Sequence, residues 1–147
     1  MPIHVEIVSQ ERKVFDEPEA DMVLIPGTEG MMGVLPHHAP VLTTLQFGEL
    51  IVRKGEAEES FAIFGGVVDI RPDKVVVLAD LAESSHHLNR EAAEAARARA
   101  EKLLSEGIPP DQRHEATLAL RRADLELKIS RRLTQNSILR IIQDDDE

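Results

Sequence analysis

The residue pattern of this chain changes near residue 88, and the change limits the possible folds more than any other feature. Before it, short segments such as residues 3–8 alternate apolar and polar side chains, which is the period of a half-buried strand. After it, apolar residues recur at the spacing of a helix. We therefore predict an α+β protein with two modules, residues 1–87 and residues 88–147.

The first module consists of short strand-like segments separated by turn signals. Residues 41–45 and 50–52 read as separate strands, and Lys54-Gly55-Glu56 reads as a turn after them. Arg71-Pro72-Asp73-Lys74 predicts a second turn. Gly65-Gly66 interrupts a strand, for which a bulge or the close approach of another backbone is the usual cause. Strands at such close intervals indicate a β-sandwich or a barrel. With only about 85 residues, its core is small, so support from a partner surface would be unsurprising.

The second module carries the start and stop signals of two helices. Asn89 can cap a helix, the alanine-rich segment 90–104 continues it, and Gly107 ends it. A second helix is predicted from Pro110 to about Leu133, which gives an α-helical hairpin with one apolar seam. The seam is expected to take Ala93, Ala96, Ala100, Leu103 and Leu104 from the first helix and Ala116, Leu120, Ala123 and Leu127 from the second. Residues 138–142 either extend the second helix or pack as a strand.

Residues 26–40 combine three regularly spaced glycines with a rigid continuation. Gly27, Gly30 and Gly33 recur at every third position, and the segment Leu35 to Pro40 is stiffened by two prolines. One interpretation is plain turn chemistry between strands. The other is a fixed contact surface that displays the intervening methionines. A phosphate-binding loop is disfavoured, because no Lys-Ser/Thr pair follows the last glycine.

Charge is distributed unevenly between the modules. Residues 1–88 carry 15 acidic and 6 basic side chains, and residues 89–143 carry 8 acidic and 11 basic ones. The net charge of −10 and the presence of only four aromatic residues argue against a nucleic-acid partner. On the second helix, Arg121, Lys128 and Arg132 fall on one line, which is either a solvated face or a surface for an acidic protein partner.

The chain lacks the residue patterns of known catalytic and metal sites. It has no cysteine, and the pairs His37-His38 and His86-His87 would point to opposite faces of a strand. No third metal ligand has a suitable spacing, and no catalytic motif is present. We therefore predict no metal, no cofactor and no catalytic residue. No apolar run is long enough to span a bilayer, so any membrane association is expected to run through another protein.

The order of these features resembles the epsilon subunit of the F-type rotary ATP synthase, over residues 3 to about 133. The resemblance is most specific in PGTEGMMGVLPHHAP from Pro26 onward. It continues in residues 64–68 (FGGVV), 75–80 (VVVLAD) and 118–123 (LALRRA). Together these four segments carry a specificity that none of them has alone.

The resemblance implies a ten-stranded β-sandwich followed by an α-helical hairpin. It implies a non-catalytic rotor subunit of the central stalk, which couples proton-driven rotation to ATP synthesis at the cytoplasmic face of the membrane. The sandwich would grip the gamma subunit, and the segment around Met31 would rest on the loops of the membrane ring. The rotor contacts carried over by position are Glu29, Gly30, Met31, Met32, Gly33 and His38.

For the hairpin, the resemblance implies a regulatory role. In the family the hairpin lies on the sandwich, or it rises beside gamma into the catalytic alpha/beta head, where it restrains ATP hydrolysis. Basic residues of the second helix then meet an acidic loop of the beta subunit. The inhibitory cations carried over by position are Arg121, Arg122, Lys128, Arg131 and Arg132.

The sequence departs from the family pattern in two places. Many relatives carry glutamate and leucine where this chain has Met31 and Met32, so the contact would be apolar here. Some members bind ATP through a motif at the start of the first helix, where this chain has Asn89 and Ala92 in place of an acid and an arginine. Because Glu126 also replaces an arginine, we expect no useful ATP affinity, although Arg97 and Arg99 remain available.

Two other interpretations remain. The chain could be an adaptor of a different multi-subunit assembly with no catalytic activity, and co-purification with gamma would distinguish that case. It could also be a small-molecule enzyme of the sandwich class, which would require a ligand-sized pocket lined by titratable groups.

Overall fold

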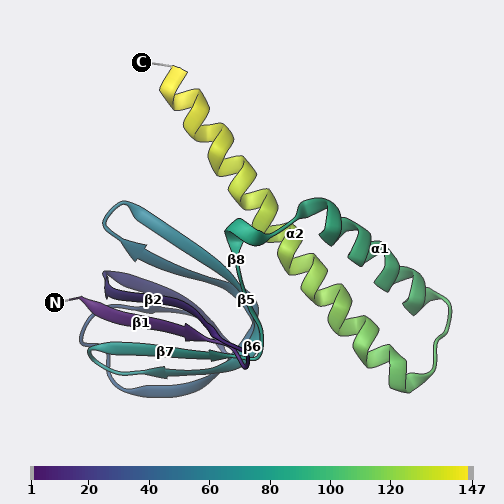
Figure 1. The fold of residues 1–147 in the computed structure, drawn as a ribbon, viewed down its shortest axis with the longest axis horizontal. Coiled ribbons are helices and arrows are strands. Elements are labelled where there is room, and N and C mark those ends of the chain that lie inside the picture. Colours follow the sequence, from purple (N-terminus) through teal and green to yellow (C-terminus); the bar gives the residue numbers. More distant parts are fainter. Residues whose placement is uncertain (1, 146–147) are drawn as a thin grey trace. The chain divides into compact units, whose positions relative to one another are not determined.

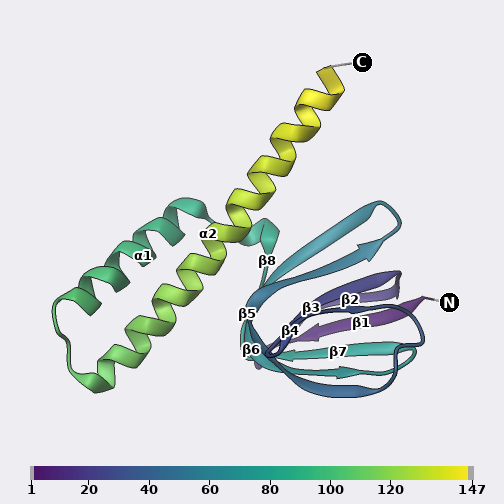
Figure 2. The same cartoon turned by 180° about the vertical axis from the view of Figure 1, so that it is seen from behind.

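The computed structural model describes the backbone of residues 2–145 and the side chains of residues 2–133. The chain divides into two compact units, Met1–His87 and Leu88–Glu147. Figures 1 and 2 show the strands of the first unit and the paired helices of the second from opposite sides.

The first unit is built from one continuous sheet. Its strand order is β2-β1-β7-β6-β5-β3-β4, and β8 pairs with β6. A short 3₁₀ turn, Ser85–His87, follows the last strand. Within the described residues the strands are β1 (Ile3–Val8), β2 (Lys13–Ala20), β3 (Met22–Gly27), β4 (Gly30–Val34), β5 (Val41–Lys54), β6 (Ala57–Ile70), β7 (Lys74–Ala79) and β8 (Ala82–Ser84).

The sheet folds over on itself into a β-sandwich, and the two long strands β5 and β6 take part in both layers (Figure 1). The sandwich expected from the sequence is confirmed, but the described residues contain eight strands rather than ten. The difference arises because β5 and β6 each continue through a position that the sequence suggested as a break. In β6 that position is Gly65-Gly66, where both glycines have positive φ and bend the strand without ending it.

The core of the sandwich is aliphatic and lies between the two layers. Alternate residues of β1 are fully buried, namely Ile3, Val5 and Ile7, because successive side chains of a strand point to opposite faces. Burying each such side chain contributes about 1.5–3 kcal/mol. The other members of the core come from every remaining strand: Ala20, Val23, Ile25, Val34, Leu45, Leu50, Val52, Phe61, Ile63, Val68, Ile70, Val75, Val77, Ala79 and Ala82.

Strand β1 pairs with one antiparallel neighbour and one parallel neighbour. It runs antiparallel to β2 and parallel to β7, with Val5 opposite Val75 and Val8 opposite Leu78. The first strand of the chain is therefore inserted beside a strand about 70 residues later in the sequence. This register also brings His4 next to Lys74 on the face that points away from the core.

The second unit consists of α1 (Arg90–Ser105) and α2 (Pro110–Asp145). The predicted cap is confirmed, since the Asn89 side chain accepts a hydrogen bond from the Ala92 amide at 3.1 Å. Gly107, with φ of 69°, follows the end of α1 as expected for a glycine beyond a C-terminus. Helix α2 extends beyond the predicted Leu133 to Asp145, because no glycine or proline follows Pro110 to stop it. Residues 146–147 of the acidic tail lie outside the described residues.

Helix α1 lies alongside the first part of α2 in both views (Figures 1 and 2). The alanines Ala93 and Ala100 of α1 and Ala116 and Ala123 of α2 are buried, which confirms these members of the predicted seam. Leu103 is different: it is 46% exposed, so its expected place in the seam is wrong. Side chains as small as alanine let the two helix backbones approach closely, but each of them buries little apolar area.

Candidate functional site: contact surfaces of the two units

The glycine segment forms a hairpin between β3 and β4. Gly27 pairs with Gly30, so Thr28 and Glu29 form the turn, and Gly30 takes a φ of 131° that disfavours other residues. The turn is attached to β5, because the Thr28 amide donates to the Thr44 carbonyl at 3.1 Å and their hydroxyls are 2.9 Å apart. The turn between strands that the sequence offered as one interpretation is therefore present, and it is hydrogen-bonded to β5.

The two methionines of this hairpin point to opposite faces. Met31 is 57% exposed, whereas Met32 packs against the buried core and lies opposite Ile25 in the register. Neighbouring residues of a strand necessarily alternate in this way. Any apolar contact made by the tip therefore depends on Met31, and Met32 contributes to the fold.

The loop after β4 carries the remaining candidate rotor contact, His38. Its neighbour His37 has a φ of 70°, and the His37 amide donates to the Pro72 carbonyl at 2.8 Å. The His38 amide donates to the Leu35 carbonyl at 3.2 Å. Glu29 precedes β4 and His38 follows it, so the structure distributes the six candidate residues along this edge strand and its flanking turns.

An apolar surface that the sequence reasoning missed lies on the outside of the layer containing β7. Leu42 of β5 is 72% exposed and Leu78 of β7 is 51% exposed. Cross-strand register brings Val67 beside Leu78 and Val8 beside Leu78 from the other side, and directly opposed side chains share a face. We call Val8, Leu42, Val67, Val76 and Leu78 the outer apolar face, and Asp69 lies within it between Leu42 and Val76. Exposed apolar surface of this kind marks interaction sites.

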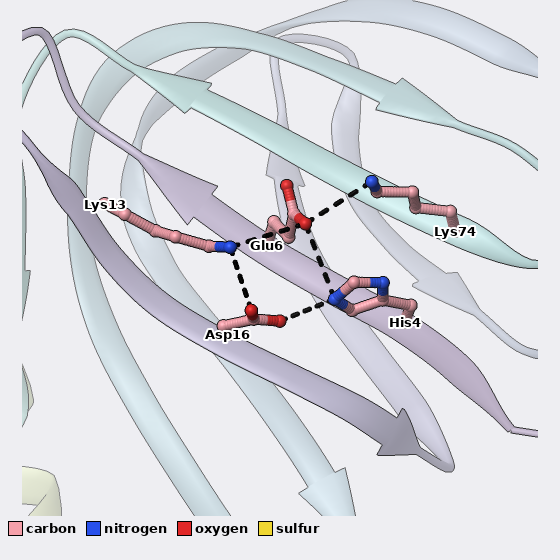
Figure 3. A network of polar contacts seen from close by, with 5 residues as sticks. All are labelled: His4, Glu6, Lys13, Asp16 and Lys74. Atoms are coloured by element: carbon pink, nitrogen blue, oxygen red, sulfur yellow. Dashed lines mark hydrogen bonds and ion pairs between the residues drawn. The ribbon is translucent and has the colours of Figure 1, made fainter.

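A network of five charged or polar side chains borders this face (Figure 3). Glu6 of β1 lies between two lysines, with Lys74 Nζ at 3.3 Å and Lys13 Nζ at 3.5 Å. Lys13 also binds Asp16 at 2.8 Å, and His4 Nε2 lies 2.5 Å from the same carboxylate. The network links the three adjacent strands β2, β1 and β7 by their side chains.

The lysines determine the ionisation of the two carboxyl groups. Partial burial of Glu6 opposes its charged form, but the hydrogen bonds and charges of Lys74 and Lys13 outweigh it and lower the pKa of Glu6. Hydrogen bonds from Lys13 and His4 lower the pKa of Asp16. Both carboxylates are therefore stabilised in the charged state by the folded arrangement.

The same cluster contains three potential metal ligands. Ligand atoms of His4, Glu6 and Asp16 lie within 4.8 Å of one another, a donor set that a divalent cation accepts. However, Lys13 and Lys74 already contact the two carboxylates and balance their charge. A cation would have to displace both ammonium groups, so the residues present fit an ion-pair network and do not fit a metal site.

The basic residues of α2 lie on the described part of the helix. Arg121, Arg122, Lys128 and Arg131 are exposed and Arg132 is half-buried. Asp124 is one of the two acids among these basic residues. It accepts a hydrogen bond from Arg97 of α1 at 2.6 Å. Residues 121–132 of the helix thus carry five basic and two acidic side chains.

A small pocket lies between β2 and the hairpin of β5 and β6. Its volume is about 190 Å³, and its lining includes Phe15, Val52, Glu17 and Lys54. The charged pair at its edge is an ion pair of 2.7 Å, and Glu17 raises the pKa of Lys54. A lysine held more firmly in its charged form is not activated as a base. The described residues of this pocket therefore offer no support for the small-molecule enzyme interpretation.

Comparison with known proteins identifies the family. The family model described as the ATP synthase delta/epsilon chain β-sandwich domain matches residues 2–85. The ATP synthase epsilon chain of Dehalococcoides mccartyi strain BAV1 is 43% identical over 129 residues, which cover 87% of this chain and 91% of the relative. The epsilon chain of Moorella thermoacetica is 45% identical over 127 residues, which cover 86% of this chain and 94% of the relative. The chain belongs to the ATP synthase epsilon chain family.

Solved structures share the fold of this epsilon chain at low sequence identity. A chain in the Euglena gracilis mitochondrial ATP synthase aligns with a TM-score of 0.74 at 22% identity, covering 84% of this chain and 78% of the other. A chain in the central stalk and c-ring structure of the Tetrahymena thermophila mitochondrial ATP synthase aligns with a TM-score of 0.57 at 12% identity, covering 87% and 96%.

The family confirms the prediction of an ATP synthase stalk subunit over that of an adaptor for an unrelated assembly. Among the described residues of this epsilon chain, no helix combines the length and the apolar character needed to cross a bilayer. The sequence singled out the glycine segment of the β3–β4 hairpin and the basic helix, but it did not indicate strand β4, the outer apolar face or the network beside that face. Leu42, Val67 and Leu78 were readable as apolar residues at the solvent-facing positions of their strands.

Proposed function

We propose that the sandwich of this epsilon chain binds the gamma subunit through the outer apolar face. The observation that supports this role is the exposure of Leu42 and Leu78, at 72% and 51%, on a rigid sheet whose opposite face is fully buried. An apolar surface without a partner is unfavourable in water, and a stalk subunit must be held firmly to the shaft with which it turns. The ion-pair network at its border supplies a polar rim.

Exchange of the two leucines for charged residues tests this assignment. Leu42→Glu and Leu78→Glu are expected to reduce co-purification with gamma by at least about tenfold, because each buries a charge in the contact. Leu103→Glu is the matched control, since Leu103 is also exposed, at 46%, but lies on α1. Retention of gamma by both sandwich variants, with their folding verified, would refute the assignment.

We further propose that the edge strand β4 and its flanking turns rest on the loops of the membrane ring, at the cytoplasmic face of the membrane. Glu29 and Met31 are exposed on this edge and His38 is half-buried, while Gly30 and Gly33 keep the backbone accessible. The attachments of the hairpin to Thr44 and of the loop to Pro72 support a rigid contact. In this arrangement the chain transmits rotation and performs no chemistry itself.

The hairpin is proposed to restrain ATP hydrolysis by entering the alpha/beta head. The supporting observation is the basic surface of α2, which would meet an acidic loop of the beta subunit through Arg121, Arg122, Lys128, Arg131 and Arg132. A chain that ends at residue 88 tests this role, because the core of the sandwich is drawn wholly from residues 3–82. We expect it to assemble normally and to raise ATP hydrolysis by the complex. Failure to assemble would contradict the division of roles between the two units.

A further inference from the structure

An ion pair connects the two helices of the hairpin. The Arg97 Nε atom of α1 lies 2.6 Å from Asp124 Oδ1 of α2, and its Nη1 atom lies 2.9 Å from Glu101, one turn further along α1. Glu101 therefore orients the guanidinium group from its own helix while Asp124 binds it from the other. The two acids together raise the pKa of Arg97, and the largest cause is the hydrogen bond that Arg97 donates to Asp124.

The ion pair lies beside the buried residues of the seam between the two helices. Arg97 lies between Ala93 and Ala100, which are both buried, and Asp124 follows the buried Ala123. The buried side chains of the seam are four alanines and Leu127, and the alanines contribute little apolar area to helix pairing. Alanine side chains are also alike in shape, and they select one register of the helices only weakly. An ion pair between one residue of each helix favours a single register of the two helices, which alanine side chains do only weakly.

The surroundings of Asp124 on its own helix provide it with other partners. Arg121 and Lys128 lie three and four residues away, which is the spacing at which helical side chains interact. When α1 separates, the carboxylate can exchange Arg97 for these residues and is never left without a countercharge. The ion pair therefore favours the paired helices, and its loss leaves neither a buried charge nor a carboxylate without a nearby basic residue.

We infer that the Arg97–Asp124 ion pair is the latch that holds α1 against α2 and keeps the hairpin closed. Both side chains are partly exposed, at 42% and 51%, so the contact is modest and is screened by salt. The ion pair changes the equilibrium constant between paired and separated helices severalfold, so both states remain accessible. Its consequence for ATP hydrolysis rests on the regulatory role proposed above, but its effect on the helices does not.

The absence of cysteine from the chain makes a direct measurement simple. Cysteines introduced at the exposed positions Lys102 and Ala119 would be the only labelling sites, and pulsed electron spin resonance on the full-length chain would report the distances between the helices. Asp124→Ala is expected to increase the separated population roughly two- to fivefold at low salt. In the unsubstituted chain, rising salt should produce a similar increase.

Glu94→Ala is the matched control. Glu94 is 51% exposed, as Asp124 is, and it pairs with Arg90 within α1 alone, at 3.1 Å. Its loss should leave the distances and their salt dependence unchanged. The double variant Arg97→Ala with Asp124→Ala should match Asp124→Ala, because the latch is already absent. If Asp124→Ala and Glu94→Ala behave alike, the latch is refuted.

Assays on the assembled ATP synthase separate this inference from the proposed function. If Asp124→Ala opens the hairpin and also lowers ATP hydrolysis by the complex, both are supported. If it opens the hairpin in the free chain and hydrolysis does not change, the latch stands and the inhibitory role of the hairpin is wrong.

Discussion

Gly66 of β6 lies directly against the backbone of Leu78 in β7, so that a Cβ atom at Gly66 would be 2.2 Å from the Leu78 carbonyl oxygen. The same atom would be 2.8 Å from Ala79 Cα. This close approach occurs where β6 bends from one layer of the sandwich to the other. The side chain of Leu78 points outward into the apolar face, so the bend positions a residue of the proposed gamma contact.

Gly66→Ala is expected to destabilise the sandwich by at least about 3 kcal/mol, because the added carbon overlaps backbone atoms that cannot move independently. Gly30→Ala separates this effect from backbone strain, since Gly30 has the same φ of 131° but no atom within 4 Å of the added Cβ. Urea unfolding of the two variants measures the difference. Equal losses would show that strain alone, and not the contact with Leu78, requires glycine at position 66.

The stability of the sandwich should fall as the solution becomes acidic. Because the folded state lowers the pKa of Glu6 and Asp16 below their ordinary values of 4.5 and 3.8, the unfolded state binds more protons in this range. The stabilisation is fully present above these values and is lost as the pH falls through and below them. Thermal melting from pH 6 to pH 3 should show a shallower decline for Glu6→Gln than for the unsubstituted chain. Glu11→Gln, in the turn between the same two strands, should reproduce the original slope.

Substitutions of the two methionines of β4 should have different effects, one on stability and the other on binding to the membrane ring. Met32→Ala is expected to cost about 2 kcal/mol of stability, because it removes a side chain that packs against the core. Met31→Ala should change stability by less than about 0.5 kcal/mol, since its side chain is 57% exposed, but it should weaken retention of the chain on the membrane ring. The checks are urea unfolding and pull-down with the ring. A reversed order of the two stabilities would contradict the register of β4.

The helix cap at Asn89 should be measurable on its own. Asn89→Ala removes the acceptor of the Ala92 amide and is expected to cost about 1 kcal/mol. Amide hydrogen exchange should then accelerate in the first turn of α1, whereas Asn89→Ser should restore most of the protection. Unchanged exchange in the alanine variant would mean that packing, and not the cap, determines where α1 begins.

Titration of the isolated chain with Mg-ATP should reveal no micromolar binding. The Asn89 oxygen already caps α1, and the Arg97 guanidinium lies between the carboxylates of Asp124 and Glu101. A phosphate group would have to compete with both acids for Arg97, one of the two arginines that the sequence left available. Calorimetry that gave a micromolar dissociation constant would overturn this expectation.

The helical features were readable from the sequence because their signals are local. Asn89 and Gly107 act on the backbone within one turn of themselves, and both appear in the structure where they were expected. The eventual length of α2 was underestimated, since a fall in apolar periodicity after Leu133 resembles a helix end although no breaking residue follows. Leu103 was assigned to the seam because its helical spacing is compatible with it, but burial depends on the partner helix.

The strand features that were missed depend on pairings between distant residues. The close backbone approach expected as one interpretation of Gly65-Gly66 is present, against Leu78. That the strand continues through these glycines follows only from the pairing of β6 with β5 and β7. The ion-pair network joins Glu6 to Lys74, which requires knowledge that β1 and β7 are neighbours. The separate roles of Met31 and Met32 likewise depend on the pairing of β4 with β3.

The parallel alignment of β1 with β7 has a consequence for how the chain is made. Hairpins such as β3–β4 can form as soon as their residues leave the ribosome, but the middle of this layer cannot close until about 80 residues have emerged. Until then β1 exposes one hydrogen-bonding edge, which is a template for association with other chains. Biogenesis of this subunit should therefore be most vulnerable to aggregation during the interval between synthesis of its first strand and its seventh.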